Sequence, residues 1–183
     1  MARGRTWLIS VLLLALVLRL MAAFVVQQQV GGQLCLIAGD ADGYWKLAQR
    51  IAAGKEFSLY DPPRRIHRMP GFPVVLALSM TLFGQSVIAA RCLLAVVGTA
   101  ACGAVYLLGR RLFDEQVGLL ACVLSAISPV MAGFSVLLLS ETLFALALTL
   151  SVWLAAKWLE EEKGEEKGSG PFSRNPRSRF GWA

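Results

Sequence analysis

Acidic and basic side chains stand at the borders of long apolar segments in this chain. Asp40 and Asp42 follow the first apolar run, and Glu141 lies just before the last one. A carboxylate at such a border can act as a general base toward a hydroxyl group. An arginine at the same level, such as Arg68, can hold a phosphate and stabilise it as a leaving group. These residue types suit group transfer from a phosphate-linked donor, provided that they share one side of a membrane.

Each of these residues also has a plainer interpretation. Asp42 could cap a helix expected over residues 44–53, and Arg91 could simply extend its long side chain to the interface. Arg68 could anchor lipid headgroups. Glu141 could mark a helix start, since an acid is favoured at that end of the helix dipole.

The elements that must position these residues are membrane-spanning helices. Hydrophobic residues make up 56% of the 183-residue chain, against about 45–50% in soluble domains. They are concentrated in runs of spanning length. The net charge is +6, but Lys and Arg flank the apolar runs, which is typical of topology determinants rather than nucleic-acid binding. A single histidine, His67, argues against a His-rich metal site, and the four cysteines form no CxxC pair.

The sequence therefore predicts an all-α integral membrane protein with about four transmembrane helices and juxtamembrane interfacial helices. The spans are expected at about 7–26, 87–108, 117–134 and 142–158. Residues 27–86 would form an extracytoplasmic loop that carries the interfacial helices, of which Gly54 would end the first. The module would cover residues 1–158, followed by a flexible, charged cytoplasmic tail over 159–183.

Two topologies compete for this chain, and they differ in the apolar stretch at residues 70–83. If that stretch spans the membrane, Arg110 and Arg111 fall outside. If it lies in the interface, both arginines and both termini fall in the cytoplasm, which the positive-inside rule favours. Arg19 is expected to extend toward the outer interface. We favour the second topology, in a bacterial inner (plasma) membrane, although the first run could instead be a signal peptide.

The order of several short motifs resembles a known family. "GDADGYWKLAQRIAAG" follows the first span, and "RMPGFP", "RRLF" and "LLLSETLF" come after it in that order. This order is similar to the N-terminal part of the polytopic GT-C glycosyltransferases, in the superfamily of dolichyl-phosphate-mannose-protein mannosyltransferases and aminoarabinose transferases. The resemblance covers roughly residues 7–158. Members of the family are longer and have more spans.

The resemblance implies an inverting transfer of a sugar from a polyprenyl-phosphate donor on the extracytoplasmic face. Asp40 would be the catalytic base, Glu141 the second acidic position of the catalytic site, and Arg68 the phosphate contact. Asp42, Tyr44 and Arg91 complete the candidate substrate contacts. No cofactor is required, although some members of the wider class hold a divalent cation, and oxygen ligands suit Mg²⁺ or Mn²⁺.

Two hypotheses of different kinds follow. The first is a membrane glycosyltransferase module that is a fragment of a longer enzyme, with the sugar donor, membrane lipids and possibly a second chain of further helices as partners. The alternative is a non-catalytic membrane protein, such as an assembly partner, a degenerate relative or a transporter accessory subunit.

Overall fold

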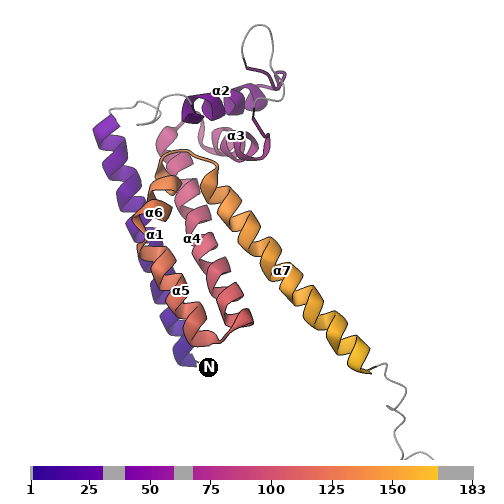
Figure 1. The fold of residues 1–183 in the computed structure, drawn as a ribbon. Coiled ribbons are helices and arrows are strands. Elements are labelled where there is room, and N and C mark those ends of the chain that lie inside the picture. The colour runs from indigo at the N-terminus through magenta and orange to yellow at the C-terminus, as the bar shows by residue number, and fades with distance from the viewer. Residues whose placement is uncertain (1, 31–39, 60–67, 169–183) are drawn as a thin grey trace, which may run out of the picture.

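A computed structural model describes residues 2–30, 40–59 and 68–168. Within these ranges the chain forms seven α-helices and no β-strand (Figure 1). In chain order they are α1 (Ala2–Val30), α2 (Asp40–Ala52), α3 (Gly71–Phe83), α4 (Val87–Leu112), α5 (Glu115–Ile127), α6 (Pro129–Val136) and α7 (Glu141–Gly168). Arg64, Arg65, His67, Cys35 and the end of the predicted tail lie outside the described residues.

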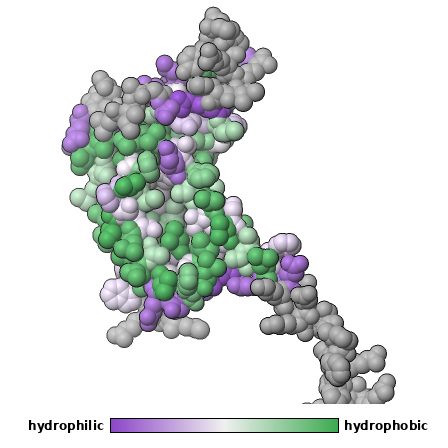
Figure 2. All heavy atoms as spheres, viewed as in Figure 1, coloured by the Kyte–Doolittle hydropathy of each residue, from purple (hydrophilic) through white to green (hydrophobic). Residues whose placement is uncertain are grey.

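The long helices are apolar enough to cross a membrane. Segments of α1, α4 and α7 meet the length and hydropathy needed for a span. Helices α5 and α6 meet them only as a pair, bent by 56°, which is the geometry of a broken span or of a re-entrant loop. The surface of this bundle is largely hydrophobic, and its hydrophilic residues gather toward the ends (Figure 2). The prediction of an all-α integral membrane protein is confirmed.

The bundle has two distinct ends (Figure 1). The start of α1, the turn between α4 and α5, and the end of α7 lie at one end, whereas α2 and α3 lie at the other. Arg110 and Arg111 are therefore at the end opposite Asp40 and Arg68. There Arg111 pairs with Glu160 of α7 at 2.6 Å, which ties α7 to α4. The assignment of either end to the cytosol stays a prediction.

Helix α2 begins earlier than the periodicity predicts. Asp40 and Asp42 both occupy its first turn, where the helix dipole favours negative charge. Asp42 is thus inside the helix, and its interpretation as the cap of a helix over 44–53 is wrong. The predicted stop is confirmed, because Gly54 adopts a positive φ of 64° and the Lys55 amide donates to the Arg50 carbonyl.

Helix α3 does not span the membrane by length. Its 13 residues extend about 20 Å at 1.5 Å per residue, against a hydrocarbon thickness of about 30 Å. It packs against α2 and leads through a short link into α4. A shared core joins Trp45 of α2, Leu76 of α3, Leu94 of α4 and Leu138, so α2 and α3 form a platform fixed to one end of the bundle.

The predicted span over 117–134 is divided into two helices. Ser128 accepts a hydrogen bond from the Met131 amide, and Pro129 follows at the first position of α6. Proline lacks the amide that would continue α5, so the chain bends here. Helix α7 continues to Gly168, ten residues beyond the predicted span, since the sequence after Leu159 is rich in Glu and Lys, which are good helix formers.

The helices of the bundle pack closely against one another. At the α4–α5 hairpin, a Cβ on Gly118 would lie 2.7 Å from the Arg110 amide nitrogen and 2.8 Å from the Tyr106 carbonyl oxygen. Arg19 lies inside the bundle and is 1% exposed. The expectation that Arg19 extends to the interface is wrong, because its side chain turns inward between helices and bonds their backbone carbonyls.

Candidate active site

A groove of about 780 Å³ opens where the platform meets the start of α7. Four of the six predicted site residues line it, namely Asp40, Tyr44, Arg68 and Glu141. They come from α2, from the segment before α3, and from the first residue of α7. Residues separated by about a hundred positions in the sequence therefore meet at one site.

Arg68 is the centre of the groove's polar wall. Its guanidinium donates to the Asp40 carboxylate at 2.7 Å, and it lies over the Tyr44 ring with 4.5 Å from Cζ to the ring centroid. The Arg68 side chain is only 10% exposed, whereas that of Asp40 is 68% exposed. The guanidinium is thus largely enclosed, while the carboxylate remains open to solvent.

Gly43 makes this arrangement possible. A Cβ at this position would lie 2.7 Å from Arg68 Nε and 2.9 Å from Cζ, both closer than an ordinary van der Waals contact. The guanidinium therefore rests against the bare backbone of α2. Glycine within a helix costs stability relative to alanine, and here it allows the close approach of Arg68.

Tyr44 contacts the segment before α3, helix α3 and the link before α7. Its ring packs edge-on against Phe72 of α3, with centroids 5.0 Å apart and planes at 81°, a favourable geometry for aromatic pairs. Its hydroxyl lies 3.3 Å from the Ser140 hydroxyl, close to α7. Tyr44 thereby fixes the distance between Arg68 and the start of α7.

The link between α6 and α7 places Ser140 and Glu141 at the groove. Leu138 in this link has a φ of 56°, which is unfavourable for a bulky side chain. The residue is fully buried in the core shared with α2, α3 and α4. Because burial of a leucine is worth about 1.5–3 kcal/mol, it can offset a strain of about 1–3 kcal/mol.

Two predicted site residues do not line the groove. Arg91 is fully buried; its Nε donates to the Val136 carbonyl at 3.1 Å and its Nη1 to Gln27 at 2.6 Å. It joins α1, α4 and α6. Asp42 is half-buried in the first turn of α2, next to the groove in sequence but absent from its lining.

Sequence reasoning missed Gly43, Phe72 and Ser140. A glycine inside an amphipathic helix was an available indication for the first. Nothing in the sequence pairs Ser140 with Tyr44, since 96 positions separate them. In the described ranges, no three His, Cys, Asp or Glu side chains group closely enough to hold a metal ion, so Asp40, Asp42 and Glu141 do not form such a group.

Comparison with known sequences identifies the family. Residues 66–167, more than half of the chain, match the family described as dolichyl-phosphate-mannose-protein mannosyltransferase. The chain belongs to this family. The mannosyltransferase match includes Arg68 and Glu141 and begins after Asp40 and Tyr44. Searches of curated proteins and of solved structures gave no match.

Proposed function

We propose that the chain transfers a sugar from a polyprenyl-phosphate donor to an acceptor on the extracytoplasmic face of the membrane. The observation that carries this proposal is the groove in which Asp40, Arg68 and Glu141 meet. Its position at the end of the bundle away from Arg110 and Arg111 fits the positive-inside rule for an outward-facing site. We place the chain in a bacterial inner membrane with both termini in the cytoplasm.

The residues divide into two roles according to exposure. Arg68, enclosed and cationic, would bind the donor phosphate through a charge-assisted contact and stabilise it as it leaves. Asp40, exposed on the open side, would accept the proton of the attacking hydroxyl. Glu141 faces the same groove from α7 and would orient the acceptor or the sugar.

The ion pair between Arg68 and Asp40 couples these roles. The two groups pair with one another at 2.7 Å. A phosphate at Arg68 competes for the same guanidinium and releases the Asp40 carboxylate to act as a base. Donor binding would thereby prepare the base.

The apolar side of the groove suits the lipid part of the donor. Met69, Leu143, Phe144 and Ala147 line it, and Met69 and Phe144 are 80% and 67% exposed. An isoprenoid chain covering them would bury apolar surface at about 25 cal/mol per Å². Phosphate and chain would therefore bind on adjacent walls.

The test is turnover of a polyprenyl-phosphate sugar by the full chain in nanodiscs, measured as release of polyprenyl phosphate. Because a positioned base contributes about 10²–10⁴-fold, Asp40→Asn should lose most of the rate. Asp42→Asn is the matched control, two positions away in the same helix turn, and should keep it. If Asp40→Asn and Asp42→Asn both turn over the donor at the rate of the unaltered chain, Asp40 is not part of the mechanism.

An assembly role is the second candidate, and the exposure of α7 favours it. Only 6% of its spanning window is buried, and Leu148, Leu154 and Trp158 are exposed. Such a face can receive helices from a second chain. The turnover assay should therefore be repeated with membranes of the native cell. Binding of polyprenyl phosphate without turnover in either setting would favour a non-catalytic module.

A further inference from the structure

A separate hollow lies at the second half of α2, on the platform but away from the groove. Its volume is about 560 Å³, and it is lined by α2, by the turn that follows and by the link before α4. We call it the basic recess, and its polar lining includes Lys46, Gln49, Arg50, Lys55 and Gln85. None of its lining residues lines the proposed active site, so it is a second feature of the platform.

The basic recess presents three cations, and none of its described lining residues carries a carboxylate. Neither Lys46 nor Lys55 forms an ion pair within the described part of the chain. The Arg50 side chain makes one hydrogen bond there, from Nε to the Glu56 carbonyl oxygen at 2.9 Å. Glu56 is the only acid in residues 43–59, and its side chain does not line the recess. The described residues therefore leave the charge of the recess without a counter-charge.

The backbone of α2 and of its end gathers these cations. Lys46 and Arg50 are four positions apart in the helix and thus lie on one face. The positive φ of Gly54 and the hydrogen bond from the Lys55 amide to the Arg50 carbonyl at 2.8 Å turn Lys55 back toward the helix end. Like charges at this spacing repel, and the negative end of the α2 dipole offsets only part of that cost. An anion in the recess would remove the remainder.

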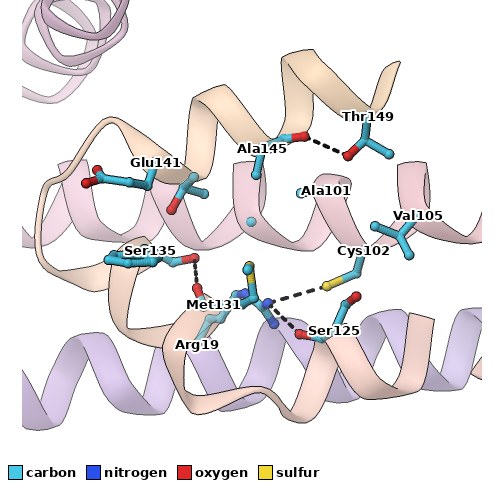
Figure 3. A pocket seen from close by; sticks show the side chains of 13 residues that line it. Arg19, Ala101, Cys102, Val105, Ser125, Met131, Ser135, Glu141, Ala145 and Thr149 are labelled. Atoms are coloured by element: carbon cyan, nitrogen blue, oxygen red, sulfur yellow. Dashed lines mark hydrogen bonds between the residues drawn. The ribbon is translucent and has the colours of Figure 1, made fainter. Parts of the chain in front are cut away.

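Arg19 shows how this chain holds a cation that needs no external partner. It lines a pocket of about 220 Å³ inside the bundle, where its guanidinium donates to Cys102 Sγ at 3.4 Å and to the Ser125 carbonyl at 3.3 Å (Figure 3). Lys46 and Lys55 have no such acceptors among the described residues, and both are exposed. The basic recess, unlike the interior pocket, is therefore open to an anion from outside.

The recess lies where the platform meets a membrane-spanning helix. Gln85, which accepts a hydrogen bond from Gln49 of α2 at 2.9 Å, is two positions before Val87, the first residue of the span α4. Leu82 and Phe83, at the end of α3 and within three positions of Gln85, are 65% and 62% exposed. Exposed apolar side chains thus adjoin the recess cations at the level where a span begins. This combination suits a ligand with an anionic head and a hydrocarbon tail.

The charges narrow the chemistry of that ligand. Lysine and arginine both bind phosphate oxygens, and basic clusters at a membrane surface attract anionic headgroups. A zwitterionic lipid would bring a cation of its own to the lysines, and a soluble phosphate would make no use of Leu82 and Phe83. The volume of about 560 Å³ falls within the range of about 300–1,000 Å³ that ligand sites occupy, so a glycerophosphate headgroup fits.

We propose that the basic recess binds the phosphate headgroup of an anionic membrane phospholipid. The bound lipid anchors the second half of α2 at the membrane surface, with its chains along the exposed end of α3. This inference goes beyond the proposed glycosyl transfer and does not depend on it, because the two sites share no lining residue.

The test measures phospholipid binding to the full chain in detergent by native mass spectrometry, which resolves each bound lipid. Phosphatidylglycerol should bind more tightly than phosphatidylcholine. Because one basic residue near anionic lipid changes the affinity about fivefold, Lys46→Gln should weaken phosphatidylglycerol binding by that factor. Neutralising Lys46, Arg50 and Lys55 together should weaken it about a hundredfold. Lys46→Arg keeps the charge and should bind within about twofold of the unaltered chain.

The matched control removes the same charge from the opposite end of the bundle. Arg5, Arg110 and Lys157 are exposed there, and replacing all three with glutamine should leave the tightest phosphatidylglycerol site within about twofold of its affinity. Equal losses for the two triple variants would show attraction to net charge alone and overturn the proposal. Equal affinities of the unaltered chain for phosphatidylglycerol and phosphatidylcholine would overturn it too.

A third arm separates a lipid headgroup from a soluble phosphate. Glycerol 3-phosphate presents the same phosphate without acyl chains, so at equal concentration it should leave phosphatidylglycerol bound. If it displaces the lipid, the recess binds a soluble phosphate and the assignment to a lipid is wrong. Thermal unfolding of each variant checks that the fold is kept. A folded Lys46→Gln chain that binds phosphatidylglycerol as tightly as the unaltered chain would exclude the recess as the binding site.

Discussion

Replacing Gly43 with alanine should change the position of the Arg68 side chain with little effect on the stability of α2. The new Cβ would lie 2.7–3.0 Å from three atoms of the guanidinium region, so Arg68 must retreat by roughly 1 Å to reach ordinary contact. The neighbour that moves is the end of a flexible side chain. We therefore expect α2 to remain folded and the guanidinium to be displaced.

The two effects have opposite signs. Gly→Ala inside a helix adds about 0.5–1 kcal/mol. Weakening an ion pair whose carboxylate is mostly exposed removes about 0.2–1 kcal/mol. The free energy of unfolding should therefore change by less than about 1 kcal/mol. A displaced phosphate contact should cost about 1.5–3 kcal/mol of binding, which corresponds to a roughly 10- to 150-fold weaker affinity for polyprenyl phosphate.

The assay measures thermal unfolding and polyprenyl phosphate binding on the same nanodisc samples. Gly133→Ala is the matched control, since a Cβ there meets no atom within 4 Å and Gly133 is also helical. It should bind lipid normally. Normal binding by Gly43→Ala would refute the role of close Arg68 packing, and a large loss of stability would make Gly43 a structural residue instead.

Three further predictions use other contacts. Gly118→Ala should destabilise the chain by about 2 kcal/mol or more through backbone clash, whereas Gly103→Ala, whose Cβ has 3.9 Å to its nearest neighbour, should be tolerated when unfolding is compared. Tyr44→Phe removes the contact with Ser140 and should cost about 0.5–1.5 kcal/mol in a denaturation series, with the Phe72 packing kept. In a Cys35→Ser background, Glu141→Cys should react with a membrane-impermeant maleimide from outside intact cells, and reaction only after lysis would contradict the proposed orientation.

Which residues lie at the same end of the helix bundle could be predicted from hydropathy and charge. The apolar runs alternate with basic clusters, and α3 is too short to cross, so Asp40, Arg68 and Glu141 had to share one end. The family resemblance, inferred from motif order, was correct. Both results depend on segment lengths and motif spacing, which a sequence contains directly.

The contacts within the site could not be predicted in the same way. Arg19 and Arg91 are arginines in apolar segments, and sequence alone does not tell whether such a side chain turns to the interface or into the bundle. Both turn inward and bond backbone carbonyls of other helices. The pairing of Tyr44 with Ser140 likewise depends on the unusual backbone of Leu138, which no local preference indicates.

The distance in sequence between the walls of the groove has a consequence for biogenesis. Chains are made from the N-terminus, so α2 and α3 are synthesised before Ser140 and Glu141 exist. The Arg68–Asp40 pair can form at that stage, but Tyr44 has no partner for its hydroxyl until the ribosome has added α6 and the start of α7. The site is therefore completed late, and a defect in inserting α7 would leave a platform with its acid and arginine already paired and nothing opposite them.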